Sequence, residues 1–193
     1  LAIAALPCIA QLWLSPRLPA LQQEFPELQI SISAMEAPPS GPREAFDLAL
    51  FYLAEPPPGA LALAEDSLVP ICSPHLAQQL RTLADLRGKT LLHDAVWRGD
   101  WARWLRHAGV AGIDPGRGPS YSLYALALDA ALGGSGILIG RTSLIAPLLT
   151  QGRLATPFAD ALPSGDQLTI LPAPAGRPHP LRARVMEWLA NSL

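Results

Sequence analysis

The residues that could do acid–base chemistry are few and widely spaced. The four histidines are His75, His93, His107 and His179, and no two of them have the spacing of a zinc-binding helix. His93 is followed directly by Asp94, so this pair could orient a ligand or act as a general base. It could equally cap the next helix or face solvent. The sequence therefore predicts no metal and no cofactor, and it offers one acid–base candidate.

The glycine-rich stretch 133–136 does not have the setting of a phosphate-binding loop. It lies between an expected helix and an expected strand, whereas a dinucleotide-binding loop follows a strand and opens a helix. A nucleophile motif of the form G-x-S-x-G also fails, because Ile137 occupies its last position. No Walker-type phosphate loop is present. We interpret these glycines as a helix end and a tight turn.

The two cysteines, Cys8 and Cys72, do not indicate a disulfide-stapled fold in a chain of this length. Cys8 falls at the start of an expected helix, where a thiolate is stabilised. It could be a redox sensor with Cys72 as its resolving partner. Cys72, however, has the apolar surroundings of a core residue.

Two expected helix starts directly follow structured segments: one at Pro7-Cys8, the other at Ser120-Tyr121-Ser122. Free backbone N–H groups at such positions bind carboxylates or phosphates. In open α/β sheets, ligands bind beyond the carboxyl ends of the strands. The two helix starts could therefore face a shared cleft. The alternative is ordinary capping, in which Ser120 or Ser122 caps a helix that runs to residue 132.

The elements that must position these residues alternate between strands and helices. Proline clusters among the 21 prolines mark loops. The apolar patterns predict strands at 1–5, 28–34, 47–53, 67–72, 89–93, 136–140 and 167–171. They predict a first helix from Pro7 to 21 or 24, with a kink at Pro16 and Pro19. Further helices are predicted at 97–108, 143–149 and 181–193. Residues 73–74 are predicted to start a helix, and 82–86 to form a short helical turn. Trp97 falls outside the apolar stripe of its helix, which is formed by Trp101, Trp104 and Leu105. This alternation predicts an α/β fold with largely parallel sheets.

The composition excludes several classes of protein. Half of the 193 residues are hydrophobic and 16% are charged, which is enough apolar surface to bury a core. The formal net charge is −2, and Lys89 is the only lysine, so this piece lacks the basic surplus of a nucleic-acid-binding domain. No apolar run is long enough to span a membrane, and we expect no secretion signal, because the apolar start at 1–6 is too short for one. We expect a cytoplasmic domain excised from a longer protein.

Several motifs together resemble one family. The stretch PCIAQLWLSPRL at 7–18 is similar to the opening of the effector-binding domain of LysR-type transcriptional regulators. Further motifs follow in the order of the family: EFPEL at 24–28, DLALFY at 47–52, LVPICSP at 68–74, TLLHD at 90–94 with DWARWL at 100–105, and the stretch 126–141. The motifs at 90–105 resemble the glycine-cleavage activator subgroup. The resemblance covers nearly the whole chain.

The resemblance implies a type 2 periplasmic-binding-protein-like fold. Two Rossmann-like lobes, lobe I with 1–72 and 171–193 and lobe II with 73–170, would be joined by two crossing strands. A small-molecule effector would bind in the cleft between them. The resemblance also implies a winged helix-turn-helix DNA-binding domain before this chain, and head-to-tail pairing of the effector domains in homodimers or tetramers.

The family's ligand-binding positions carry over to this sequence in part. Cys8 stands where the family usually has a serine or threonine, and Phe51 where it usually has an arginine. These departures leave open a less polar or aromatic effector, or none. The implied effector-binding residues are Pro7, Cys8, Ile9, Ser33, Tyr52, His93, Asp94, Trp97, Ser120, Tyr121 and Ser122.

The resemblance thus implies an effector-sensing, dimerising domain of a bacterial transcription regulator, not an enzyme, that shifts oligomer geometry to control DNA binding. Two alternatives share the fold. A solute-binding protein of a transporter would need a secretion signal. An enzyme would need an acid–base pair, for which the sequence offers only His93 and Asp94.

Overall fold

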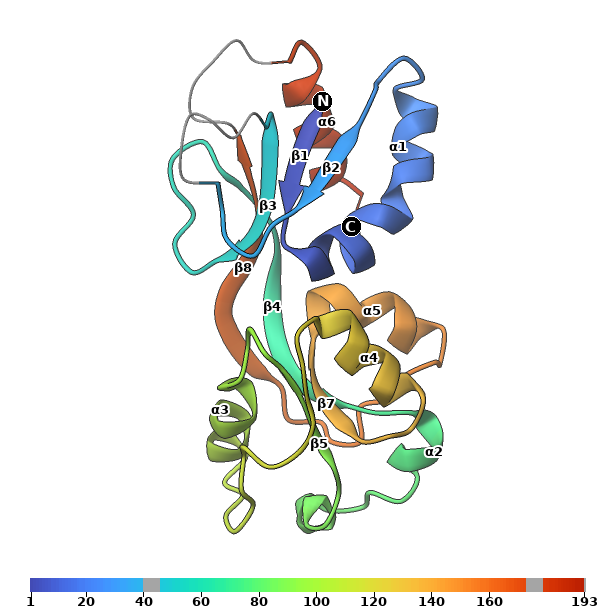
Figure 1. The fold of residues 1–193 in the computed structure, drawn as a ribbon, viewed down its shortest axis with the longest axis vertical. Helices are drawn as coiled ribbons and strands as arrows, with labels where there is room; N and C mark the ends of the chain where they lie inside the picture. The colour runs from blue at the N-terminus through green and yellow to red at the C-terminus, as the bar shows by residue number, and fades with distance from the viewer. Residues whose placement is uncertain (40–45, 173–178, 193) are drawn as a thin grey trace. The chain divides into compact units, whose positions relative to one another are not determined.

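The computed structural model describes residues 1–39, 46–172 and 179–192, and its contacts divide the chain into two units (Figure 1). Unit 1 comprises Leu1–Asp66 and Gly165–Leu193, and unit 2 comprises Ser67–Ser164. The chain passes between the units within two long strands, β4 (Leu61–Ile71) and β8 (Leu162–Pro172). The lobes expected from the sequence divide at 72/73 and 170/171. These boundaries lie nearer to the ends of β4 and β8 than the boundaries at 66/67 and 164/165 that the structure gives.

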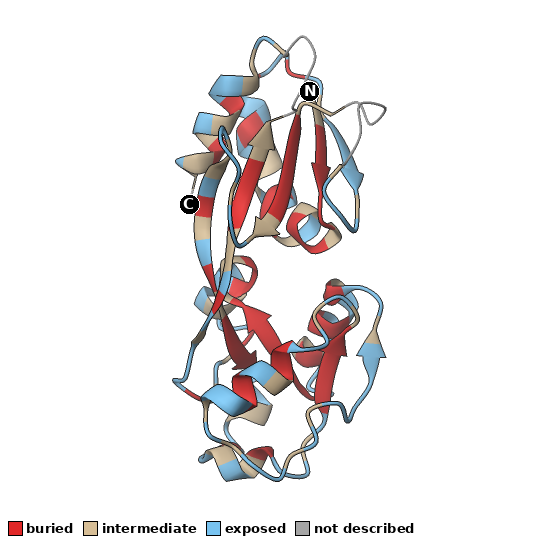
Figure 2. Ribbon diagram, turned by 90° about the vertical axis from the view of Figure 1, so that its left-hand side faces the viewer, coloured by how far each residue is buried: buried red, intermediate tan, exposed pale blue. Residues whose placement is uncertain are grey.

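Unit 1 is built on a mixed sheet in the order β2-β1-β3-β8. β1 (Ala2–Ala5) pairs in parallel with β2 (Ser31–Ala34) and with β3 (Leu48–Leu53), whereas β8 runs antiparallel to β3. β1 and β3 are mostly buried, and β2 is exposed (Figure 2). The continuous apolar runs of β1 and β3 therefore form the core of the unit, as buried parallel strands do.

The helical segment after β1 changes its type at the prolines, as predicted. It begins as a π-helix, η1 (Ile9–Leu14), tightens to a 3₁₀ turn, η2 (Ser15–Arg17), and continues as α1 (Leu18–Glu24). Pro16 and Pro19 each lie in the first two positions of their helix, where the missing N–H costs no hydrogen bond. The last helix, α6 (Arg182–Ala190), buries Val185 and Leu189; Leu193 of the expected helix lies outside the described residues.

Unit 2 has the sheet order β4-β7-β5-β6. β7 (Ile137–Arg141) runs antiparallel to β4 and parallel to β5 (Leu91–Asp94), and β5 runs parallel to the short β6 (Ser120–Tyr121). The helices are α2 (Pro74–Ala77), the 3₁₀ turn η3 (Leu83–Leu86), α3 (Asp100–His107), α4 (Tyr124–Leu132) and α5 (Thr142–Thr150). None of the described helices is long and apolar enough to cross a bilayer.

The aromatic stripe of α3 forms the core of unit 2. Trp101, Trp104 and Leu105 are buried, as the helical spacing predicts. The indole Nε1 of Trp101 donates a hydrogen bond to the carbonyl oxygen of Leu92, 3.0 Å away, and that of Trp104 donates to the carbonyl oxygen of Asp160 at the same distance. These bonds satisfy the polar end of each buried ring.

The structure corrects the expected start of α4. Neither Ser120 nor Ser122 caps this helix: Ser120 lies in β6, Ser122 is exposed, and the N-cap position is taken by Leu123, which makes no side-chain capping bond. The reason is that residues 120–121 pair with β5 and are extended. The predicted helix end is confirmed, because Gly133 is the C-cap and Gly134 has a φ of 78°, which glycine adopts without strain.

Candidate functional site

Three parallel strands end at the same edge of the unit 2 sheet. The registers place His93 beside Ser120 and Asp94 beside Tyr121, and β7 ends at Arg141 next to β5. Ligands bind beyond the carboxyl ends of parallel strands. The structure thus brings together the unit 2 residues predicted from the sequence, and we call this place the carboxyl edge of unit 2.

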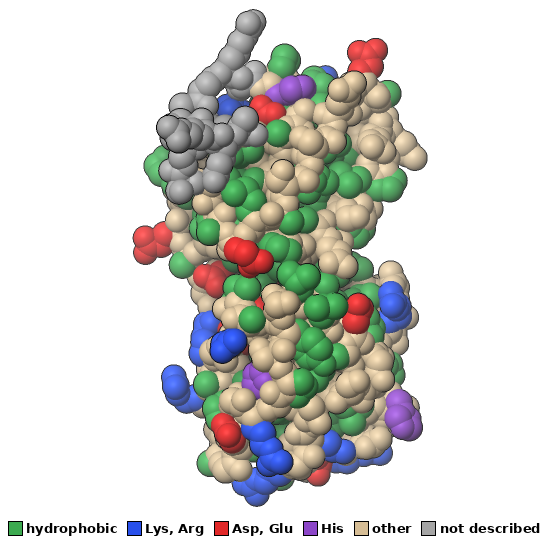
Figure 3. All heavy atoms as spheres, in the orientation of Figure 1, with side chains coloured by type: hydrophobic (Ala, Val, Ile, Leu, Met, Phe, Trp, Pro, Cys, Tyr) green, Lys and Arg blue, Asp and Glu red, His purple; other side chains and the backbone are tan. Residues whose placement is uncertain are grey.

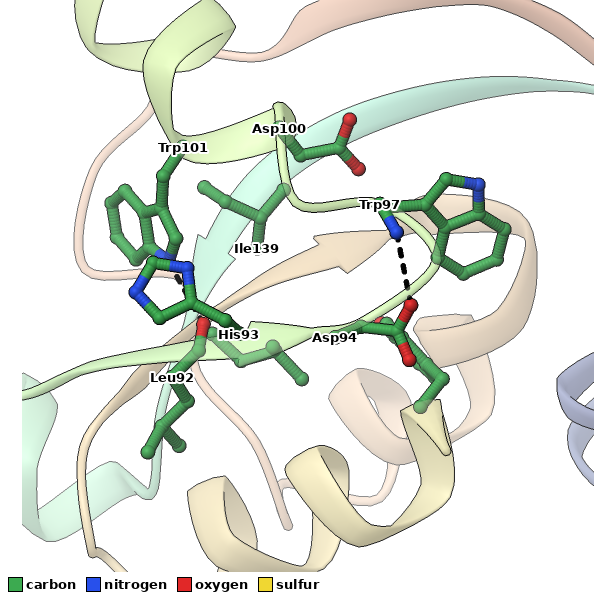
Figure 4. A pocket seen from close by; sticks show the side chains of 9 residues that line it. Leu92, His93, Asp94, Trp97, Asp100, Trp101 and Ile139 are labelled. Carbon is green, nitrogen blue, oxygen red and sulfur yellow. Dashed lines mark hydrogen bonds between the residues drawn. The ribbon is translucent and has the colours of Figure 1, made fainter. Parts of the chain in front are cut away.

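Asp94 shapes the loop that follows β5. Its Oδ1 accepts a hydrogen bond from the backbone N–H of Val96, at 2.8 Å. It accepts a second from the backbone N–H of Trp97, at 3.1 Å (Figure 4). This turn keeps Trp97 at the carboxyl edge and out of α3, which begins at Asp100 and not at Trp97 as the sequence predicted. Asp94 is 5% exposed, so its carboxylate holds the loop in place.

His93 does not pair with Asp94. The two side chains leave β5 in opposite directions (Figure 4), as successive residues of a strand must. The His93 Nε2 lies 3.2 Å from the carbonyl oxygen of Arg117. A carbonyl oxygen only accepts, so this contact places a proton on Nε2. The geometry therefore gives His93 a structural bond to a loop and offers no acid–base dyad with Asp94.

A buried arginine, which the sequence analysis missed as a site residue, lies at the carboxyl edge. Arg141 is 1% exposed. Its Nη2 lies 3.3 Å from Oδ2 of Asp100, and its guanidinium lies 3.8 Å from the centre of the Trp97 ring. Its backbone N–H donates to the hydroxyl of Tyr124, 3.2 Å away. The sequence signal was a charged residue directly after the apolar run GILIG.

These four residues, Trp97, Asp100, Tyr124 and Arg141, form what we call the arginine cluster. The Trp97 and Tyr124 rings meet edge to face with centres 5.5 Å apart. The Asp100 carboxylate neutralises the buried guanidinium, and the Trp97 ring face adds a cation–π contact. The cluster presents aromatic surface and little net charge at the carboxyl edge.

A small cavity lies inside the edge, under the arginine cluster. Its volume is about 10 Å³, and its lining includes His93, Asp94, Trp97, Asp100 and Tyr124 (Figure 4). A space of that size holds about one water molecule. A larger ligand would therefore contact these residues from the edge of the sheet.

The predicted residues of unit 1 lie at or near the carboxyl ends of β1, β2 and β3. Pro7, Cys8 and Ile9 directly follow β1; Cys8 and Ile9 are buried. Ser33 is exposed on β2 in register with Ala4, and Tyr52 is half-buried near the end of β3. The backbone of Cys8 and Ile9 is thus better placed to meet a ligand than their side chains.

The two cysteines are free thiols and both are buried. Burial raises the pKa of Cys72 to about 11, so this residue stays a thiol at neutral pH. Only the thiolate reacts quickly with oxidised sulfur. The structure therefore disfavours Cys72 as the resolving partner of a redox pair.

Among the described residues no cluster of His, Cys, Asp and Glu could hold a metal ion.

The raised pKa of Cys72 predicts a pH dependence of stability. The unfolded thiol loses its proton near its ordinary pKa of 9.0, whereas the folded thiol keeps it to about 11. Between these values the unfolded state binds fewer protons, so the free energy of unfolding falls as the pH rises. Urea melts from pH 8 to 11 should show a slope that Cys72→Ala reduces. A slope that Cys72→Ala leaves unchanged would contradict this.

The family of the chain follows from a match over its whole length. Residues 1–193 match the family described as the LysR substrate binding domain. The chain belongs to this family. Its sequence is 34% identical over 169 residues to the glycine cleavage system transcriptional activator of Escherichia coli K12, covering 85% of this chain and 55% of that protein. It is 31% identical over 189 residues to the transcriptional regulator TrpI of Pseudomonas aeruginosa, covering 94% of this chain and 63% of that protein.

Solved structures agree with this family. The effector binding domain of AmpR from Citrobacter freundii superposes with a TM-score of 0.83 and 25% identity, covering 99% of this chain and 96% of that one. The resemblance to the LysR family and the type 2 periplasmic-binding-protein-like fold are thereby confirmed. The chain spans about half of the length of the curated relatives that it matches, 55% for the first of them.

Proposed function

We propose that this chain is the effector-sensing and dimerisation domain of a bacterial LysR-type transcription regulator. The observation that carries the proposal is the match of all 193 residues to the effector-binding part of such regulators. The full protein would act in the cytoplasm and bind DNA through a winged helix-turn-helix domain that precedes this chain. Matching relatives named as transcription regulators support a regulatory rather than an enzymatic role.

The carboxyl edge of unit 2 is the proposed contact surface for the effector within that unit. Its groups are the hydroxyls of Ser120 and Ser122, the ring of Tyr121 and the Trp97 face of the arginine cluster. In unit 1 the proposed contacts are the backbone at Pro7 to Ile9 and the side chains of Ser33 and Tyr52. Because Asp100 already neutralises Arg141, the edge favours a small polar or aromatic compound over a multiply charged anion.

The mechanism we propose is a shift between populations. An effector changes the regulator only as far as it binds one domain or dimer geometry better than another. Couplings of about 1–3 kcal/mol correspond to changes of 5–150-fold. Such a shift would move the attached DNA-binding domains relative to each other.

The distribution of charge supports head-to-tail pairing of two copies. Unit 1 contains five Lys and Arg against ten Asp and Glu, a formal net charge of −5, whereas unit 2 contains nine against six, a formal net charge of +3. Pairing that sets unit 1 of one copy beside unit 2 of the other brings opposite charges together. The formal net charge of the whole chain, −2, does not reveal this difference between the two units.

The charge asymmetry predicts a salt-sensitive dimer. Salt screens charges that lie more than about 8 Å apart at physiological ionic strength. We expect the dimer dissociation constant, measured by analytical ultracentrifugation, to rise roughly tenfold or more between 50 mM and 1 M NaCl. A monomer at all concentrations, or a dimer that tightens with salt, would contradict the proposed pairing.

The test of the effector role is a thermal-shift screen against amino acids, small carboxylates, aromatic acids and cell-wall fragments. A ligand at 100 times its Kd stabilises the folded state by about 2.7 kcal/mol, which corresponds to about 5–10 °C in Tm for a chain of this size. We expect one class to give such a shift. If no class does, the chain does not sense effectors of these kinds.

A further inference from the structure

A groove at the opposite edge of the unit 2 sheet carries a surplus of positive charge. It has a volume of about 420 Å³, which lies in the range of small-molecule sites. One wall is the segment that leads into β5, with Arg87 and Lys89; the other is the loop with Asp114 and Arg117. The lining thus has three cations and one carboxylate, and the Asp85 carboxylate outside the lining also interacts electrostatically with Lys89. Figure 3 shows Lys and Arg side chains gathered over this end of unit 2.

The three cations of this groove have no carboxylate partner within ion-pair distance among the described residues. Arg87 Nη2 donates to the carbonyl oxygen of Ala111, and Lys89 Nζ to Oε1 of Gln79, each at 3.1 Å. These acceptors are neutral. The guanidinium of Arg117 makes no hydrogen bond or ion pair to the part of the chain that the structure describes. The groove therefore holds positive charge that a bound anion could neutralise.

Glycines open the walls of the groove between these side chains. Gly88 has a φ of 81°, and a Cβ built on it meets no atom within 4 Å. Gly112 has a φ of 77°, and its built Cβ would lie 3.7 Å from Nη2 of Arg87. A ligand can therefore approach the backbone closely and still reach the guanidinium. Backbone N–H groups beside cationic side chains are the usual components of anion sites.

We propose that this groove binds a small multivalent anion, a phosphate group or a compound with two or three carboxylates, as a second ligand of the domain. The site is separate from the carboxyl edge. The groove lies at the start of β5, which it meets at Leu91, and the carboxyl edge lies at the end of β5, at Asp94. The proposal does not depend on the effector site, and either can fail alone.

The loop that forms one wall of the groove is also attached to β5. A Cβ on Gly118 would clash with the carbonyl oxygen of Leu91, so the loop packs directly on the strand. The carbonyl oxygen of the preceding residue, Arg117, accepts a hydrogen bond from Nε2 of His93. The wall of the groove is thus held in place before any ligand arrives, which lowers the cost of ordering it on binding.

The test is a titration of the ¹⁵N-labelled 193-residue chain, followed by ¹H–¹⁵N NMR at constant ionic strength. One series uses inorganic phosphate and the other uses citrate. We expect saturable shifts of the amides of Gly88, Gly112 and Gly118. Arg117→Gln should raise the Kd roughly tenfold, the effect of losing one charge-assisted contact. Arg153→Gln, the same change at an exposed arginine outside the groove, should leave the Kd unchanged.

Each outcome decides the proposal. Saturation by phosphate alone supports it and identifies a phosphate-bearing ligand, and saturation by citrate alone identifies a polycarboxylate. Shifts that do not saturate, that spread evenly over unit 2, or that weaken equally in R117Q and R153Q show general screening and overturn it. Failure here with a positive effector screen would leave the proposed function intact.

Discussion

Arg141→Met is expected to lower the free energy of unfolding by about 3–5 kcal/mol, the effect of removing one partner of a buried ion pair. Arg141 is 1% exposed, and its Nη2 lies 3.3 Å from Asp100 Oδ2. Removing the guanidinium leaves the Asp100 carboxylate, whose side chain is 10% exposed, with the more exposed Arg103 as its remaining cation, 3.5 Å away. Urea unfolding at pH 7 measures the loss.

Two further variants separate the ion pair from general damage. Arg141→Met with Asp100→Asn removes both charges, so we expect the double variant to lose less than the sum of the two single variants. Arg106→Met changes an exposed arginine on the same helix as Asp100, and it should shift stability by no more than about 0.5 kcal/mol. A loss below 1 kcal/mol for R141M would show that the arginine cluster does not stabilise the carboxyl edge.

Trp104→Ala is expected to cost a similar amount, about 3–5 kcal/mol, because it empties the centre of the unit 2 core. Trp104 is fully buried, and its ring centre lies 6.1 Å from that of Trp101 and 6.2 Å from that of Phe158. Urea unfolding followed by far-UV circular dichroism measures this loss, since removing an indole alters fluorescence directly.

Trp104→Phe separates packing from hydrogen bonding. It keeps an aromatic ring but loses the Nε1–H that donates to the carbonyl oxygen of Asp160, so we expect a cost of about 1–3 kcal/mol. Trp188→Ala removes a half-buried indole from α6 in unit 1 and should cost less than Trp104→Ala. Equal losses at Trp104 and Trp188 would contradict the account of the core.

Local patterns predicted the elements of this fold well. The spacing of Trp101, Trp104 and Leu105 predicted the buried face of α3, and the prolines at 16 and 19 predicted the breaks in the first helical segment. These features depend on neighbours within one or two turns of helix. The serine cap predicted for α4 is wrong because residues 120–121 pair with β5, a contact between segments that no local pattern shows.

The candidate site was predicted only in part for the same reason. His93 and Asp94 were found because they lie at a strand end, which can be recognised locally, whereas Tyr121 was placed at a helix start and lies in β6 instead. The sequence suggested that an arginine was missing, since Phe51 replaces the usual one. Arg141 instead pairs with Asp100, 41 residues earlier in the chain. A partnership over such a distance depends on the register of β5 and β7, which the sequence alone does not reveal.

The most direct test of the central claim is calorimetric titration of a compound found in the thermal-shift screen into two matched variants. Ser122→Trp places a bulky ring at the carboxyl edge of unit 2, and Ser135→Trp places the same ring at another exposed serine, in the turn before β7. The account predicts that S122W weakens binding at least tenfold and that S135W binds like the wild type. Unchanged affinity in S122W, or equal loss in both variants, would contradict an effector site at the carboxyl edge.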